Sequence, residues 1–118
     1  MCDDPQLVVV DVSFISLKLI LPSLFKILKQ QNELVALVKP QFEVGKDEVE
    51  NKGIIKDPQK RTNVLLRLND FISEQCWALC HLTESPIQGQ KGNREYLIHC
   101  VPNGNSLSEE DIRKVIGD

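Results

Sequence analysis

Three charged residues border short apolar runs that are typical of buried β-strands. Asp11 follows the run 7–10, Lys39 follows the run 34–38, and Glu95 precedes the run 96–98. In open α/β sheets, ligands bind beyond the carboxyl ends of the parallel strands, and an antiparallel strand can start at that same edge. We therefore expect two carboxylates and one amine around a single crevice. Charged residues at strand ends are often only solvated, so these residue types alone name no reaction.

Cysteine and histidine residues form a second candidate group, made of Cys76, Cys80, His81, His99 and Cys100. On a regular strand, residues four apart share a face and the next residue points the other way. Cys76 and Cys80 would then face away from His81. Because the spacing also matches no standard zinc knuckle, we expect buried structural thiols, with neither a bound metal nor a disulfide.

The composition is that of one small globular domain. The chain has 118 residues, of which 42% are hydrophobic and 26% charged. Its net charge of −3 lacks the basic excess of a free-standing RNA-binding domain. No apolar run reaches the roughly 18 residues of a transmembrane helix, and residues 1–4 lack the basic side chains of a secretory signal. We therefore expect a cytoplasmic protein with reduced cysteines.

The first third of the chain has the pattern strand, helix, strand. Residues 7–10 form a fully apolar run that predicts a buried strand over 7–12, and residues 34–38 predict a second one. Between them, apolar residues from Leu17 to Leu28 recur at helical spacing, and Ser16 could cap that helix. Pro22 is expected to separate a short first turn from the main helix. This order is the βαβ unit of a parallel sheet.

The remainder predicts two helices and an antiparallel pair of strands. Residues 43–57 are expected to form a long loop with one helical turn, and Asp57 to cap a helix that runs to about Glu74. Strands are expected at 76–83 and 96–101, joined by a long hairpin connection, and Ser108 opens a capping-box pattern for a short final helix. The fold class is thus α/β, with two parallel strands, an antiparallel closing pair and flanking helices. The first strand would leave an apolar sheet edge exposed.

Five ordered segments carry a more specific signal. They are 11–22 (DVSFISLKLILP), 39–45 (KPQFEVG), 53–58 (GIIKDP), 85–89 (SPIQG) and 92–97 (GNREYL). Together they resemble the TlyA (haemolysin A) family of FtsJ-like RNA 2′-O-methyltransferases. The resemblance covers nearly the whole chain, from residue 7 to about residue 100, and five motifs in order are far more specific than one.

The resemblance implies the C-terminal half of a Rossmann-like class I methyltransferase sheet. Residues 1–118 would be a partial FtsJ-like domain, without the half that binds most of the cofactor S-adenosylmethionine and without the family's S4-like domain. Such enzymes use a Lys-Asp-Lys-Glu tetrad, in which Asp11, Lys39 and Glu95 would be the last three members. Lys39 would lie nearest the ribose hydroxyl, and Asp11 and Val12 would contact the cofactor.

Ribosomal RNA would be the partner of such an enzyme. Candidate phosphate contacts are Lys46, Lys56, Lys91 and Arg94, drawn from a basic set that also includes Lys52, Lys60 and Arg61. Acidic residues are interleaved with this set, so a merely solvated loop is the alternative. Trp77 is expected to pack in the core.

Three functions remain open from the sequence. The first is a piece of a ribosomal RNA methyltransferase that is inactive without its other half. The second is a non-catalytic module that binds RNA or a partner, with the exposed first-strand edge as one place of association. The third is membrane lysis, which the haemolysin name suggests. The amphipathic helices argue against lysis, because they are better explained as covers of a sheet than as interfacial helices.

Overall fold

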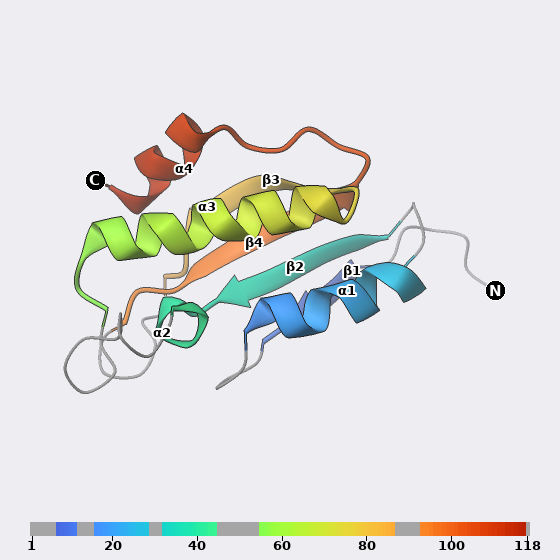
Figure 1. Ribbon diagram of the computed structural model, residues 1–118, viewed down its shortest axis with the longest axis horizontal. Coiled ribbons are helices and arrows are strands. Elements are labelled where there is room, and N and C mark those ends of the chain that lie inside the picture. Colours follow the sequence, from blue (N-terminus) through green and yellow to red (C-terminus); the bar gives the residue numbers. More distant parts are fainter. Residues whose placement is uncertain (1–6, 12–15, 29–31, 45–54, 87–92, 118) are drawn as a thin grey trace.

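The computed structural model describes residues 7–11, 16–28, 32–44, 55–86 and 93–117, and these contain one mixed sheet with helices (Figure 1). The elements in chain order are β1 (Leu7–Val10), α1 (Leu17–Ile27), β2 (Glu33–Val38), α2 (Pro40–Glu43), α3 (Pro58–Glu74), β3 (Trp77–Glu84), β4 (Tyr96–Pro102) and α4 (Glu109–Ile116). The strand order in the sheet is β1-β2-β4-β3. β1 and β2 are parallel, while β4 is antiparallel to both β2 and β3. The predicted parallel pair and closing pair are confirmed.

Helix α1 runs without a break from Leu17 to Ile27, so the expected interruption at Pro22 is wrong. Pro22 removes only the hydrogen bond that its N–H would have donated to the carbonyl of Lys18, a residue on the exposed side of the helix. Leu21 and Phe25, on either side of the proline, are both buried. Burial of this apolar face holds the helix together across the proline.

Helix α3 begins and ends where local signals predict. The Asp57 side chain accepts a hydrogen bond from the backbone N–H of Gln59 at 2.9 Å, and Pro58 follows as the first helical residue. Most of the segment 43–57, where a loop with one helical turn is expected, lies outside the described residues, and a short helix, α2, occupies Pro40–Glu43 after β2. A proline at the first position of a helix has no intrahelical partner for its missing N–H, so Pro40 starts α2 as readily as it ends β2.

The helices cover one face of the sheet. Figure 1 shows α1 in front of β1 and β2, and α3 in front of β3 and β4 with α4 beside it. Alternate residues of β2 and β4 are fully buried beneath them, namely Leu34, Ala36, Val38, Tyr96, Ile98 and Cys100. Trp77 is also buried, as predicted, and stacks on Phe25 with 4.4 Å between the ring centroids.

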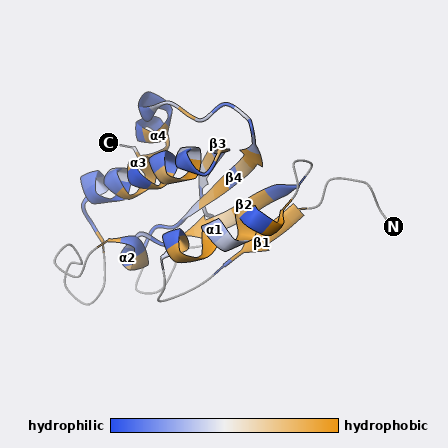
Figure 2. Ribbon diagram, turned by 45° about the vertical axis from the view of Figure 1, so that its right-hand side comes forward, coloured by the Kyte–Doolittle hydropathy of each residue, from blue (hydrophilic) through white to orange (hydrophobic). Residues whose placement is uncertain are grey.

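The other face of the sheet carries no helix among the described residues. β1 is hydrophobic along its length (Figure 2), yet Leu7 is 61% and Val9 68% exposed, and only Val10 is buried. The expectation of a fully buried first strand is therefore wrong, because β1 has a single neighbouring strand and a cover on one face only. The expected exposed edge at β1 is confirmed.

The closing hairpin contains one irregularity. Leu79 pairs with Cys100 and His81 pairs with His99, so Cys80 is the extra residue of a β-bulge. The connection between the strands closes where Ser85 N–H donates to the carbonyl of Glu95 at 2.8 Å, and residues 87–92 lie outside the described part. The predicted capping box of α4 is present between Ser108 and Asp111.

Candidate functional site

Asp11 and Lys39 form an ion pair at the carboxyl ends of β1 and β2. Lys39 Nζ lies 2.7 Å from Asp11 Oδ1. The Lys39 side chain is 14% exposed and that of Asp11 is 58% exposed, so the amine is held within the sheet edge while the carboxylate meets solvent. The parallel register sets Val10 opposite Ala36 and brings both strand ends to this edge. The structure thus places two of the predicted site residues in contact.

Glu95 approaches the same edge from the antiparallel strand. Tyr96 lies opposite Val38 in the register of β2 and β4, so Glu95 follows on beside Lys39 just beyond the paired residues. Glu95 is buried, and its Oε2 accepts a hydrogen bond of 3.1 Å from Gln41 Nε2. The other side-chain atom of Gln41, Oε1, is buried and has no hydrogen-bond partner among the described residues.

Glu43 anchors α1 to the same short helix α2. Its Oε1 accepts from Ser16 Oγ at 2.7 Å, and its Oε2 accepts from the backbone N–H of Leu17 at 2.8 Å. A carboxylate at the first turn of a helix satisfies backbone donors and interacts favourably with the helix dipole. Ser16 itself accepts from Lys18 N–H, which confirms its predicted role as a cap.

Every second residue of the segment 39–43 therefore contacts a different part of the chain. Lys39 contacts the end of β1, Gln41 contacts the start of β4, and Glu43 contacts the start of α1. Gln41 and Glu43 were not among the predicted site residues. The available signal was their place in the KPQFEVG motif, where every second residue after the strand is polar or charged.

Arg61 holds Tyr96, the residue that follows Glu95, in place by a hydrogen bond. It is buried, and it donates from Nε to the Tyr96 hydroxyl at 3.1 Å and from Nη1 to the carbonyls of Ile55 and Lys56 at 3.0 and 3.1 Å. The grouping of Arg61 with a solvated or phosphate-binding loop is therefore wrong. Burial raises the pKa of the Tyr96 hydroxyl, and the charge of Arg61 offsets part of that rise.

Of the four predicted RNA contacts, the structure describes Lys56 and Arg94, whose chain neighbours Ile55 and Asn93 are joined by a hydrogen bond of 2.9 Å from the Ile55 N–H to Asn93 Oδ1. Lys56 is exposed, and Arg94 lies 4.0 Å from Glu84 with half of its side chain exposed. Lys46, Lys91 and the predicted cofactor residue Val12 lie outside the described residues. The roles of all five remain predictions.

The cysteine and histidine group differs from the expectation. Cys76 is exposed in a turn with a φ of 64°, ahead of β3, so it is neither a buried thiol nor a strand residue. The bulge turns Cys80 and His81 toward the same side of the sheet, so the expectation that His81 points away is also wrong. Cys80 Sγ lies 3.4 Å from His81 Nδ1 and 3.5 Å from His99 Nδ1.

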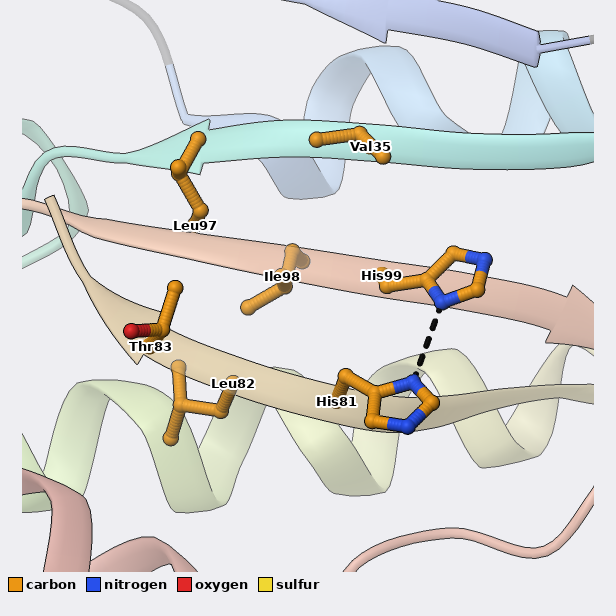
Figure 3. Close-up of a pocket in the computed structure, with 7 residues that line it drawn as sticks. All are labelled: Val35, His81, Leu82, Thr83, Leu97, Ile98 and His99. Carbon is orange, nitrogen blue, oxygen red and sulfur yellow. Dashed lines mark hydrogen bonds between the residues drawn. The ribbon is translucent and has the colours of Figure 1, made fainter.

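These side chains lie on the sheet face opposite the helices. His81 and His99 point in the same direction beside a shallow hollow of about 260 Å³, which Val35, Thr83 and Leu97 also line (Figure 3). Burial raises the pKa of the Cys80 thiol, and burial raises that of Cys100 to about 12. With nothing bound to them, both sulfurs are therefore protonated thiols at neutral pH.

An open sheet with polar residues at the carboxyl ends of its parallel strands is the architecture of an α/β nucleotide- or cofactor-binding domain. Residues 2–101 match the family described as FtsJ-like methyltransferase. The chain belongs to the FtsJ-like methyltransferase family, and the fold class expected from the sequence is confirmed.

Its relatives include proteins named as ribosomal RNA methyltransferases. The chain is 42% identical over 117 residues to "Putative rRNA methyltransferase YqxC" of Bacillus subtilis, an alignment that covers 95% of this chain and 42% of the relative. It is 42% identical over 93 residues to "16S/23S rRNA (cytidine-2'-O)-methyltransferase TlyA" of Mycobacterium tuberculosis, covering 79% of this chain and 35% of the relative. The chain therefore spans less than half the length of either protein.

A solved structure shares the fold. A protein described as "Putative hemolysin from Streptococcus thermophilus" superposes with a TM-score of 0.87 at 38% identity, over 94% of this chain and 41% of that one. Among the described residues of our chain, no helix has the length and apolar character needed to span a bilayer.

Proposed function

We propose that this chain is half of the catalytic domain of a cytoplasmic ribosomal RNA 2′-O-methyltransferase that uses S-adenosylmethionine. This half would carry three of the four catalytic residues. The observation that carries the proposal is the Lys39–Asp11 ion pair at the carboxyl ends of the parallel strands, 2.7 Å long. A second half of the domain would hold most of the cofactor, and an S4-like domain would add RNA affinity. Residues 1–118 by themselves would be inactive.

Lys39 would meet the ribose 2′-hydroxyl. A hydroxyl is a weak nucleophile, so it needs a positioned group that orients it and takes its proton. Asp11 would hold the Lys39 amine in place. Glu95 would fix the segment that follows Lys39 by accepting a hydrogen bond from Gln41. A lysine can accept a proton only as the neutral amine, whereas an arginine stays charged. Asp11 favours the charged form of Lys39, so the first lysine of the tetrad, supplied by the other half of the domain, would have to favour the neutral amine by like-charge repulsion.

S-adenosylmethionine would supply the methyl group on a sulfonium that carries its own leaving group. The described residues fit one side of this cationic cofactor, because they offer it acceptors at the sheet edge. These acceptors are the carboxylate oxygens of Asp11, whose side chain is 58% exposed. Asp11 and Val12 would contact the cofactor, and Lys46, Lys56, Lys91 and Arg94 would contact RNA phosphates.

A non-catalytic module that binds RNA or a partner is the second candidate. The exposed apolar edge at β1 favours it, since unpaired strand edges associate with other chains. Membrane lysis receives no such support. The apolar face of α1 packs into the core through Leu17, Leu21 and Phe25, and that of α4 packs through Ile112 and Ile116.

A chimera tests the enzyme. The matching segment of YqxC is replaced by this chain, and single-turnover transfer of labelled methyl groups to ribosomal RNA is measured. Lys39→Ala should lower the rate by about 10²–10⁴-fold, and Lys39→Arg should not restore it. Asp11→Ala and Glu95→Ala should also slow transfer, while RNA affinity at fixed salt stays near that of the parent.

Lys26→Ala is the matched control, because Lys26 is an exposed lysine in the last turn of α1. It should keep the parental rate. A Lys39→Ala chimera that methylates as fast as the parent would show that the catalytic assignment is wrong. A folded parent chimera that binds RNA but transfers no methyl group would favour the non-catalytic module.

A further inference from the structure

Cys80, His81 and His99 bring three potential metal ligands together. Their Sγ and two Nδ1 atoms lie within 4.8 Å of one another. The individual separations are 3.4 Å from Cys80 Sγ to His81 Nδ1, 3.5 Å from Cys80 Sγ to His99 Nδ1, and 3.1 Å between the two Nδ1 atoms. We propose that these three side chains bind a Zn²⁺ ion on the sheet face opposite the helices.

The three separations match the edges of a tetrahedral zinc site. With zinc bonds of about 2.0–2.1 Å to nitrogen and about 2.3 Å to sulfur, two nitrogens lie about 3.3 Å apart and nitrogen lies about 3.5 Å from sulfur. Each separation in this chain falls within about 0.2 Å of those values. Ligands of this N and S type suit zinc better than the oxygen-preferring Mg²⁺ or Ca²⁺.

Glu33 prepares His99 to be a ligand. Its Oε1 lies 2.6 Å from His99 Nε2. A carboxylate only accepts hydrogen bonds, so the proton of a neutral His99 resides on Nε2 and the lone pair of Nδ1 faces Cys80 and His81. In zinc sites, the ring nitrogen of a histidine that does not bind the metal commonly donates a hydrogen bond to a carboxylate in this way.

The β-bulge makes the arrangement possible. Regular alternation would send Cys80 and His81 to opposite faces, whereas the extra residue in β3 puts both beside His99 of β4. Three protein ligands leave a fourth position for water or a small ligand. The adjoining hollow, lined by Val35 and Leu97, has room for one (Figure 3).

The test uses the whole chain, stripped with a chelator and then titrated with Zn²⁺ or Co²⁺ alone. We expect about one metal ion per chain, and with cobalt a thiolate-to-metal charge-transfer band together with the intense visible bands of a tetrahedral site. Cys80→Ser should abolish the charge-transfer band, and His81→Ala should lower the affinity strongly. Glu33→Ala should weaken binding by about 10–100-fold.

Cys76→Ser is the matched control, since Cys76 is an exposed thiol that lies ahead of β3 and outside the group. It should bind metal as the parent does. His81 is exposed, so its replacement should leave the fold intact, as circular dichroism would show. The proposal would be overturned if the folded parent failed to bind Zn²⁺ or Co²⁺. It would also be overturned if Cys80→Ser and His81→Ala bound the metal as tightly as the parent does. None of these results depends on methyl transfer.

Discussion

Gln41 and Glu95 are 54 residues apart in the sequence and are joined by a hydrogen bond of 3.1 Å between Gln41 Nε2 and Glu95 Oε2. Glu95 is buried just before β4, and Gln41 lies in α2, which is separated from β2 by one residue. A buried carboxylate needs polar partners. The bond therefore couples the two segments that bring Lys39 and Glu95 to the same sheet edge.

Gln41→Ala should destabilise the chain by about 1–3 kcal/mol, because it leaves the buried carboxylate of Glu95 without this donor. Urea unfolding followed by the fluorescence of Trp77, the only tryptophan, measures the change. Gln59→Ala is the matched control, since the Gln59 side chain donates to Asn63 on an exposed helix face, and it should change stability by less than about 0.5 kcal/mol.

A double variant isolates the bond itself. Glu95→Ala combined with Gln41→Ala should cost less than the sum of the two single changes, because each residue is the other's partner. Strictly additive losses would contradict a direct coupling between Gln41 and Glu95.

Tyr96 should make the stability of the chain depend on alkaline pH. Burial raises the pKa of its hydroxyl above the usual value of 10.0, so the unfolded chain releases this proton first as the pH rises. The contribution to stability is complete below pH 10 or so and is lost as the pH climbs through the folded pKa, with a slope of at most about 1.4 kcal/mol per pH unit.

The measurement is direct, because Tyr96 is the only tyrosine and tyrosinate absorbance reports it alone. Tyr96→Phe should remove this part of the pH dependence. At neutral pH it should cost about 1–3 kcal/mol, since Arg61 Nε loses its partner. A tyrosinate titration midpoint at or below the usual value would contradict the prediction.

S-adenosylmethionine should bind too weakly to detect when this chain is titrated alone at micromolar concentration. Glycine-rich loops at helix N-termini supply much of the affinity for nucleotide-like cofactors in α/β sheets, and no such loop precedes α1 in this sequence. Isothermal calorimetry on the chain and on the YqxC chimera makes the comparison. A low-micromolar dissociation constant for the chain alone would contradict this view of the pocket.

Local signals in the sequence determined most of the elements. The Asp57-Pro58 pair predicted the start of α3, and the spacing of Ser108 and Asp111 predicted the capping box of α4. Both signals act within one helical turn, so they need no knowledge of the rest of the chain. The order of β-strands and helices also predicted that Asp11 and Lys39 would share an edge, because parallel strands end on the same side of a sheet.

Only the tertiary structure decided which side chains the fold would enclose. Arg61 is buried because the Tyr96 hydroxyl and two backbone carbonyls receive its donors. α1 continues through Pro22 because Leu21 and Phe25 are buried against the sheet. Tyr96 is 35 residues from Arg61, and the strands that bury Leu21 and Phe25 lie outside α1, so the local sequence around Arg61 or Pro22 does not reveal the outcome.

The same reason applies to the cysteine and histidine group. Alternation along a strand predicts that Cys80 and His81 face apart, and it does so correctly for a regular strand. The register of β3 against β4 inserts Cys80 as an extra residue and reverses that result. A bulge depends on two paired strands and on the core side chains that fix their register, so the sequence of either strand alone does not predict it.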